Sequence, residues 1–196
     1  MPACFRPVSL AAAAASVAAL CLMAPSAMAA AATWTVDKAA SRLTFKSAFS
    51  GESFDAAFKR WDAQITFDPK ALAASKVVVT VDTGSAATGN AERDEALPSA
   101  DWLSVMRFPR ATFVTRSFKD LGGGRYQAIG DLTLRGVSKP LVLPFTLAIT
   151  GDTADMTSDT SVDRSLFGVG QGEYGGDDVV PFNVKVKIHV SAKVAK

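Results

Sequence analysis

The amino-acid sequence predicts an all-β domain, a single closed antiparallel β-barrel of about eight strands with one or two short capping helices. Apolar and polar residues alternate with period two in several runs, which gives each run one apolar face. Turn signals separate these runs, whereas helical patterns are few and short. In the clearest run, FNVKVKIHV, Val184 and Ile188 share one face and lysines occupy the other.

The same alternation recurs earlier in the chain. Long runs joined mostly by hairpins favour a closed barrel over a sandwich, because closure removes exposed edges and creates one apolar interior. The apolar faces of these runs comprise Leu43 and Phe45; Trp61, Ala63, Ile65 and Phe67; Val77, Val79 and Val81; Tyr126, Ala128, Gly130, Leu132 and Leu134; and Leu141, Leu143, Phe145, Leu147 and Ile149.

Two positions interrupt the regular strand patterns. The apolar phase slips between Phe58 and Trp61, which predicts a bulge or a tight turn. Pro144 lies inside an otherwise regular run, and because it has no N–H group it predicts an edge or bulge position. The glycines at 122–124 and the segment 135–140 are typical of hairpin connections.

The first 29 residues have the pattern of a secretory signal peptide. Arg6 precedes an apolar run that ends at Met23, and Ala27 and Ala29 supply the small residues that a signal peptidase recognises. The apolar run is too short to favour a membrane anchor. We therefore expect cleavage after Ala29, a mature domain at residues 30–196 and export to the periplasm.

Cysteine content and charge exclude several classes of function. Both cysteines, Cys4 and Cys21, lie in the predicted signal peptide, so the mature chain has no disulfide and no thiol chemistry. The 21 basic residues fall to 20 once Arg6 is removed, against 19 acidic residues, which leaves a net charge of +1. This charge is too small to indicate binding to nucleic acid.

Two short helices are predicted. Asp68 followed by Pro69 is typical of a helix start and would open the segment KALAAS. A second helix is predicted in the segment 89–103, where Asn90 is a suitable N-cap and Pro98 ends the turn.

Four consecutive charges, Glu92 to Glu95, occupy this second helix. Arg93 shares a face with Leu97, four residues on, so Arg93 is expected to face the protein. A charge in that position needs a partner. We therefore expect Arg93 and Asp94 to tie the helix to barrel strands as a structural cap, with Trp102 nearby closing one end of the barrel.

The residues support no catalytic or metal site. His189, the only histidine, lies in the polar phase of a strand and is expected to face solvent. Carboxylate pairs that include Asp94 and Glu95 remain an enzymatic alternative, because their separation depends on the fold. The glycine-rich segment 168–178 precedes a strand rather than the helix of a phosphate-binding loop, so we interpret it as a turn at the barrel mouth.

Alternation shows that one face of each strand is buried but not what fills the interior. A packed core and a hollow apolar interior both fit, since an eight-stranded barrel is wide enough for either. The residues alone leave this choice open.

Five motifs follow one another along the chain: WTVDKAASRLTFKS, FKRWDAQITFDP, ERDEALPSADWLSVMRFPRATF, GDLTLRGVSKPLVLPF and DRSLFGVGQGEY. Together they resemble the YceI-like family of exported polyisoprenoid-binding proteins, over residues 33–190. Arg93-Asp94, FPRATF and LTLRGVSKP carry most of the resemblance. Many members have a histidine where this chain has Ala40, so no head-group contact by a histidine is carried over.

The resemblance implies a lipocalin-like barrel whose apolar tunnel holds an isoprenoid lipid, either a polyprenyl lipid or a quinone tail. It implies a periplasmic binder or carrier rather than an enzyme, with no covalent cofactor, metal or nucleic acid. Transient contact with a membrane or a membrane protein, and the oligomeric state, a dimer included, stay open.

Two alternatives also stay open. One is a packed barrel that binds a partner in an envelope stress or redox system, and the other is a carboxylate-dependent enzyme at the barrel mouth. The residues expected to line the tunnel are Phe45, Trp61, Ile65, Phe67, Trp102, Phe113, Tyr126, Leu132, Leu134, Phe145, Val184 and Ile188.

Overall fold

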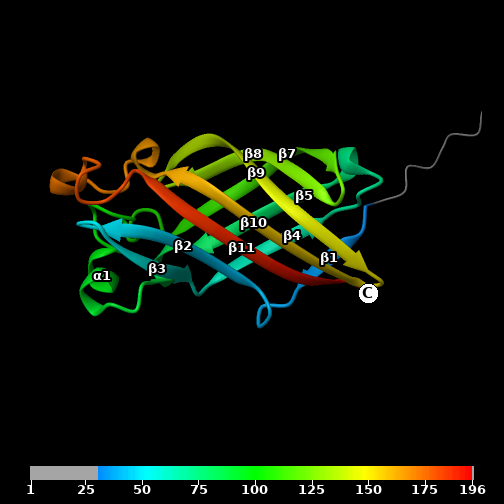
Figure 1. Cartoon of the computed structure of the whole chain (residues 1–196), viewed down its shortest axis with the longest axis horizontal. Helices are drawn as coiled ribbons and strands as arrows, with labels where there is room; N and C mark the ends of the chain where they lie inside the picture. Colours follow the sequence, from blue (N-terminus) through cyan, green and yellow to red (C-terminus); the bar gives the residue numbers. More distant parts are fainter. Residues whose placement is uncertain (1–30, 196) are drawn as a thin grey trace, which may run out of the picture.

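The computed structural model of the chain describes residues 31–195, so the predicted signal peptide lies outside the described residues. The described part is an elongated β-barrel with helix α1 (Ala91–Ala96) at one end and the C-terminus at the other (Figure 1). No helix in the described residues is long and apolar enough to cross a membrane.

Eleven strands form one antiparallel sheet that closes on itself. The ring closes because β11 pairs with β10 along one edge and with β1 and β2 along the other. The strands are β1 (Thr33–Val36), β2 (Arg42–Phe49), β3 (Glu52–Phe58), β4 (Trp61–Thr66), β5 (Lys76–Asp82), β6 (Ala86–Ala87), β7 (Arg110–Gly122), β8 (Arg125–Leu134), β9 (Val137–Thr150), β10 (Thr153–Asp163) and β11 (Asn183–Val194).

Three pairs of these strands are interrupted halves of longer strands. β1 and β2 follow each other along β11, β3 continues into β4, and β5 continues into β6 across the 3₁₀ helix η2 (Thr83–Ser85). Counted in this way, the wall is a closed antiparallel barrel of eight strands, which confirms the predicted fold class.

The break between β3 and β4 lies where the apolar phase slips, as predicted. Lys59 and Arg60 leave the regular ladder, and buried Ser85 compensates: its carbonyl accepts from Lys59 N at 3.0 Å and its Oγ accepts from Arg60 N at 3.0 Å. Because two residues separate the halves, Phe58 and Trp61 both face the barrel interior.

Pro144 lies at a local edge of the sheet, as its missing N–H group predicts. The ladder between β9 and β10 ends at Thr146, and the part of β9 before it pairs with β8 alone. The Oγ of Ser158 on β10 donates to the Pro144 carbonyl at 2.6 Å. The hydroxyl therefore occupies the side where a ladder bond would otherwise lie.

The prediction of a helix that starts at Asp68 is wrong. Only a single 3₁₀ turn forms, η1 (Leu72–Ala74), and the Asp68 carboxylate accepts from Lys70 N at 2.8 Å in a local turn. Ser75 Oγ accepts from Asp68 N at 3.0 Å and fixes this turn. Side-chain bonds to nearby backbone therefore compete successfully with helix formation.

The barrel interior away from α1 is packed with aromatic rings. Phe67 meets Phe118, Tyr126 and Phe145 edge-on at centroid distances of 5.1, 5.7 and 6.1 Å. Tyr126 and Phe145 stack at 5.4 Å, and Trp34 Nε1 donates to the Phe67 carbonyl at 2.9 Å. These rings belong to the larger of the two hydrophobic clusters among the described residues.

Replacing Phe67 with alanine should lower the free energy of unfolding by about 3–5 kcal/mol, because three neighbouring rings lose their contact at once. Urea denaturation would measure the loss. Phe49→Ala is the matched control, since Phe49 is 41% exposed at the opposite end of the barrel. Equal losses in the two variants would contradict the view that the Phe67 cluster is the packed core.

Candidate functional site

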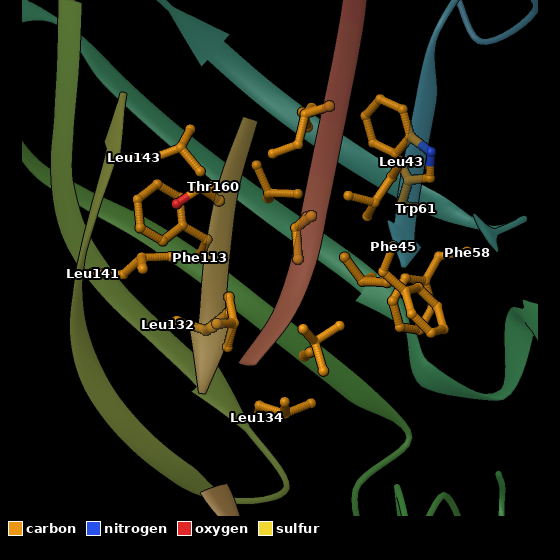
Figure 2. A pocket seen from close by; sticks show the side chains of 18 of the residues that line it. Leu43, Phe45, Phe58, Trp61, Phe113, Leu132, Leu134, Leu141, Leu143 and Thr160 are labelled. Carbon is orange, nitrogen blue, oxygen red and sulfur yellow. The ribbon is translucent and has the colours of Figure 1, made fainter. Parts of the chain in front are cut away.

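Between the aromatic cluster and α1 the barrel is hollow. A cavity of about 460 Å³ runs through this part, within the range of about 300–1,000 Å³ of small-molecule sites. Figure 2 shows Phe45, Phe58 and Trp61 on one side of this cavity and Phe113 and Leu141 on the other. The described interior is therefore hollow rather than packed along this stretch.

The sequence-predicted lining residues lie on this wall with one exception. Tyr126 does not line the cavity, because its ring is buried in the aromatic cluster against Phe145. The prediction that the Tyr126 side chain points into the barrel is correct. Alternation cannot show, however, that neighbouring rings fill the interior at this position along the barrel axis. The others all line the cavity: Phe45, Trp61, Ile65, Phe67, Trp102, Phe113, Leu132, Leu134, Phe145, Val184 and Ile188.

Helix α1 lies over the mouth of the cavity and is fastened by its own polar residues. Asn90 is the N-cap, and its Oδ1 accepts from Arg93 N at 3.0 Å. Asp94 Oδ1 accepts from the N and Oγ1 of Thr88 at 2.6 and 2.7 Å. The bond from the Thr88 hydroxyl lowers the pKa of Asp94. Asp94 therefore ties the helix to the residue that follows β6 rather than to a strand.

Arg93 faces the cavity, and its contact with the barrel is aromatic. The guanidinium lies over the ring of Phe54 on β3, 4.5 Å from the ring centroid. Its Nε is buried without a hydrogen-bond partner in the described chain. The expected tie between Arg93 and a barrel strand is thus a cation–π contact rather than an ion pair or hydrogen bond.

The segment after α1 completes the mouth. Trp102 and Leu103 line the cavity, and the Trp102 ring packs on Tyr174 at a centroid distance of 5.0 Å. Thr83, which is buried, donates from Oγ1 to the Phe108 carbonyl at 2.8 Å and holds the far end of this segment against the barrel.

Arg164 organises the loop on the opposite side of the mouth. Its guanidinium donates to four carbonyl oxygens: Pro181 at 3.2 Å, Val169 at 2.7 Å, Gly176 at 2.7 Å and Val180 at 2.6 Å. Arg164 is the first residue of the 3₁₀ helix η3 (Arg164–Phe167) and is only 3% exposed. Burial lowers the pKa of this guanidinium, which nevertheless remains a cation at neutral pH.

Sequence reasoning did not single out Arg164, Ser47 or Tyr174, although all three line the cavity. Ser47 has the inward phase of β2 but is polar, so a search for apolar faces passes over it. Arg164 precedes a glycine-rich loop that contains the 3₁₀ helix η4 (Gly172–Tyr174). The backbone carbonyls of such a loop need hydrogen-bond donors. An arginine beside such a loop is the signal that could have found it.

The other polar candidates lie away from the cavity. His189 is on the outer face of β11, where its Nε2 lies 3.0 Å from Asp155 Oδ2. Glu95 is exposed on α1. Within residues 31–195, no group of three or more histidine, cysteine, aspartate or glutamate residues is placed to hold a metal ion.

Comparison with known proteins gives a consistent picture. Residues 34–192 match the model of the YceI-like domain. Protein YceI of Escherichia coli O157:H7 is 47% identical over 95 residues, which are 48% of this chain and 49% of that protein. A UPF0312 protein of Pseudomonas savastanoi pv. phaseolicola is 40% identical over 119 residues, 59% of this chain and 62% of that protein. The chain thus spans about half the length of the first relative.

Two solved structures share the barrel. BcnA of Burkholderia cenocepacia superposes with a TM-score of 0.78 at 31% identity, covering 81% of this chain and 100% of BcnA. A polyisoprenoid binding domain from Saccharophagus degradans, implicated in plant cell wall breakdown, superposes with a TM-score of 0.66 and covers 84% of this chain and 99% of that domain. At 14% identity this second likeness concerns the fold alone.

Replacing Arg164 with methionine should loosen the loop at residues 168–182, because four carbonyls, of which those of Val169 and Val180 are buried, lose their donor. We expect a loss of stability of about 1–3 kcal/mol for each carbonyl left buried and unpaired. Hydrogen exchange should accelerate in the loop more than in β7 and β8. Arg42→Met is the control, since Arg42 is exposed. Unchanged exchange in the loop of the Arg164 variant would contradict this role.

Proposed function

The chain belongs to the family of YceI-like domains, and from this premise we propose that it binds and carries an isoprenoid lipid whose tail lies in the barrel cavity. The lipid is a polyprenyl lipid or a quinone with an isoprenoid tail. The carrier works in the periplasm, after removal of the predicted signal peptide.

The observation that carries the proposal is the continuous apolar cavity inside the barrel. A hydrocarbon tail in it is stabilised by about 25 cal/mol for each Å² of apolar surface removed from water. A tail needs no hydrogen bonds, and the wall between the aromatic cluster and the mouth offers few polar groups, Thr115 and Thr160 among them. The cavity therefore fits a long apolar hydrocarbon tail better than a polar metabolite.

Two further observations support this function. The neighbour from Saccharophagus degradans, which shares the fold, is named a polyisoprenoid binding domain. Two polar residues of the mouth, Asp94 and Arg164, are engaged in holding backbone, which suits a binding protein better than an enzyme. We therefore propose a binder without catalytic residues.

Native purification from a membrane-bearing host, followed by solvent extraction and mass spectrometry, tests the proposal. An isoprenoid lipid should co-purify in a reproducible ratio to protein. Absence of such a lipid, combined with no binding of polyprenols or quinones to the delipidated protein, would refute it. The partner-binding alternative would then take its place.

A second test blocks the cavity. Leu141 lines it, whereas Val142, its neighbour on β9, is 47% exposed on the outer face. Leu141→Trp should fill the space and weaken polyprenol binding at least about tenfold, equivalent to 1.4 kcal/mol. Val142→Trp should leave binding unchanged. Tryptophan fluorescence titration would measure both, and equal affinities would show that the tail lies elsewhere.

A further inference from the structure

The neighbouring strands β9 and β10 pair along only part of their length in the described chain. Their ladder starts at the turn between them and stops at Thr146 and Thr157. Beyond that point, within residues 31–195, β9 pairs with β8 alone and β10 with β11 alone. The two strands lie together near the C-terminus and separate from there (Figure 1). We call the unpaired stretch between residues 137–145 of β9 and residues 158–163 of β10 the seam.

Two prolines keep this stretch of β9 unpaired. The Pro144 carbonyl points toward β10, where it accepts from Ser158 Oγ at 2.6 Å. Because backbone direction alternates along a strand, the even-numbered residues in 138–144 all point across the seam. Pro140 and Pro144 are among them, and neither has an N–H group to donate. A ladder with β10, or with an added strand from another protein, would therefore find every second donor missing.

Side chains rather than backbone bonds close the seam from inside. Leu143 lies on the seam strand β9 itself and is only 9% exposed, although it also lines the cavity. Figure 2 shows Leu143 on the same side of the cavity as Phe113 and Thr160. Gly130 makes room for the Phe113 ring, since a Cβ at this position would lie 3.0 Å from two ring atoms. The closure consists of packed side chains, which can move aside without breaking a ladder.

The mouth beside α1 is held by more hydrogen bonds than the seam. Thr88 donates twice to the Asp94 carboxylate, and Arg164 donates to four carbonyl oxygens on the other side. Bonds that involve a charged group are the stronger kind. Within residues 31–195, the hydrogen bond that crosses the seam is the one from Ser158 to Pro144. Parting the seam therefore costs less than opening the mouth.

We propose that the seam is a lateral gate through which the lipid tail enters and leaves the cavity. This inference rests on the proposed function and adds the route of the ligand. Leu141 and Leu143 on β9 and Val162 on β10 line the cavity, so apolar side chains border the seam on both strands. A tail that passes between these strands exchanges one apolar contact for another. It need not thread end-on past the polar groups of the mouth.

A cleavable bridge across the seam tests the gate, because residues 31–195 contain no cysteine. Val142 and Ser161 are exposed and face each other when the register of the paired part is extended. In the variant Val142→Cys with Ser161→Cys, a bis-maleimide with a disulfide in its spacer should join the strands. Association and dissociation rates of geranylgeraniol, measured by stopped-flow tryptophan fluorescence, should both fall at least about tenfold. The Kd should stay unchanged, and reduction of the spacer should restore both rates.

The matched control bridges the paired part of the same two strands. Thr146 and Thr157 are exposed, and their Oγ1 atoms lie 2.7 Å apart. The variant Thr146→Cys with Thr157→Cys, treated with the same reagent, should keep both rates, since the ladder already joins these positions. Equal slowing in the two bridged variants would indicate a general stiffening of the barrel and would contradict a gate at the seam.

Restoring the missing donors is a test that needs no reagent. Pro140→Thr with Pro144→Thr returns two N–H groups to the edge of β9 that faces β10, so the ladder should extend. We expect slower exchange of geranylgeraniol, by a smaller factor than the bridge gives, and new protection from hydrogen exchange in residues 138–145. Pro69→Thr, in the turn before η1, is the control and should change neither.

The outcomes separate the gate from the proposed function. Unchanged rates after complete bridging at positions 142 and 161, verified by mass spectrometry, would overturn the gate and leave lipid binding in place, with the mouth as the route. Failure of the unchanged protein to bind geranylgeraniol or longer polyprenols would overturn both. Should the bridge form incompletely, the double proline variant decides, because new amide protection with unchanged exchange of lipid would also overturn the gate.

Discussion

Closure of the backbone hydrogen-bond ring along β11 is the constraint on which the rest of the structure depends. This strand pairs with β10 over residues 183–193 and with β2 and β1 in succession on its other edge. In a packed barrel, side chains from opposite walls would also hold the walls together. Here Val184 and Ile188 face a cavity, so along this stretch the ladders must keep the wall in place. The ion pairs on the outer face, such as Lys187 with Asp159, are exposed and add little.

A barrel with a cavity must obtain its stabilising side-chain packing from other parts of the interior. In this chain the larger hydrophobic cluster lies at the end of the barrel that contains Phe67. There the interior side chains are large rings that touch one another, whereas the cavity between that cluster and the mouth has rings such as Phe45 and Phe113 on opposite sides (Figure 2). The mouth has a second, smaller hydrophobic cluster of Leu103, Phe167 and Val169. Polar contacts to backbone from residues such as buried Thr83 and Arg164 also hold it. Such contacts hold the rim open without filling the cavity, which a hydrophobic plug at the same place would do.

Strand alternation predicts the wall well because a barrel strand has one inside and one outside, and a side chain on a regular strand has no third choice. That is why the inward phase of Phe45, Phe113 and Val184 could be read from the sequence, and why the slip at Lys59–Arg60 marked an irregularity. Alternation gives no depth along the barrel axis, so it could not place Tyr126 in the packed end. It also misses polar residues in an inward phase, such as Ser47. The role of Arg164 depends on carbonyls up to 17 residues away, which no local pattern contains.

The contrast between the two mouth arginines follows from what each loop offers. The glycine-rich segment after Arg164 turns its carbonyls inward, and a guanidinium with five donors satisfies several of them at once. Helix α1 has its carbonyls engaged in its own turn, so within residues 31–195 the Arg93 guanidinium packs on the face of Phe54 rather than on carbonyl oxygens. An aromatic ring attracts a cation but accepts no strong hydrogen bond, and the donor capacity of Arg93 remains unused.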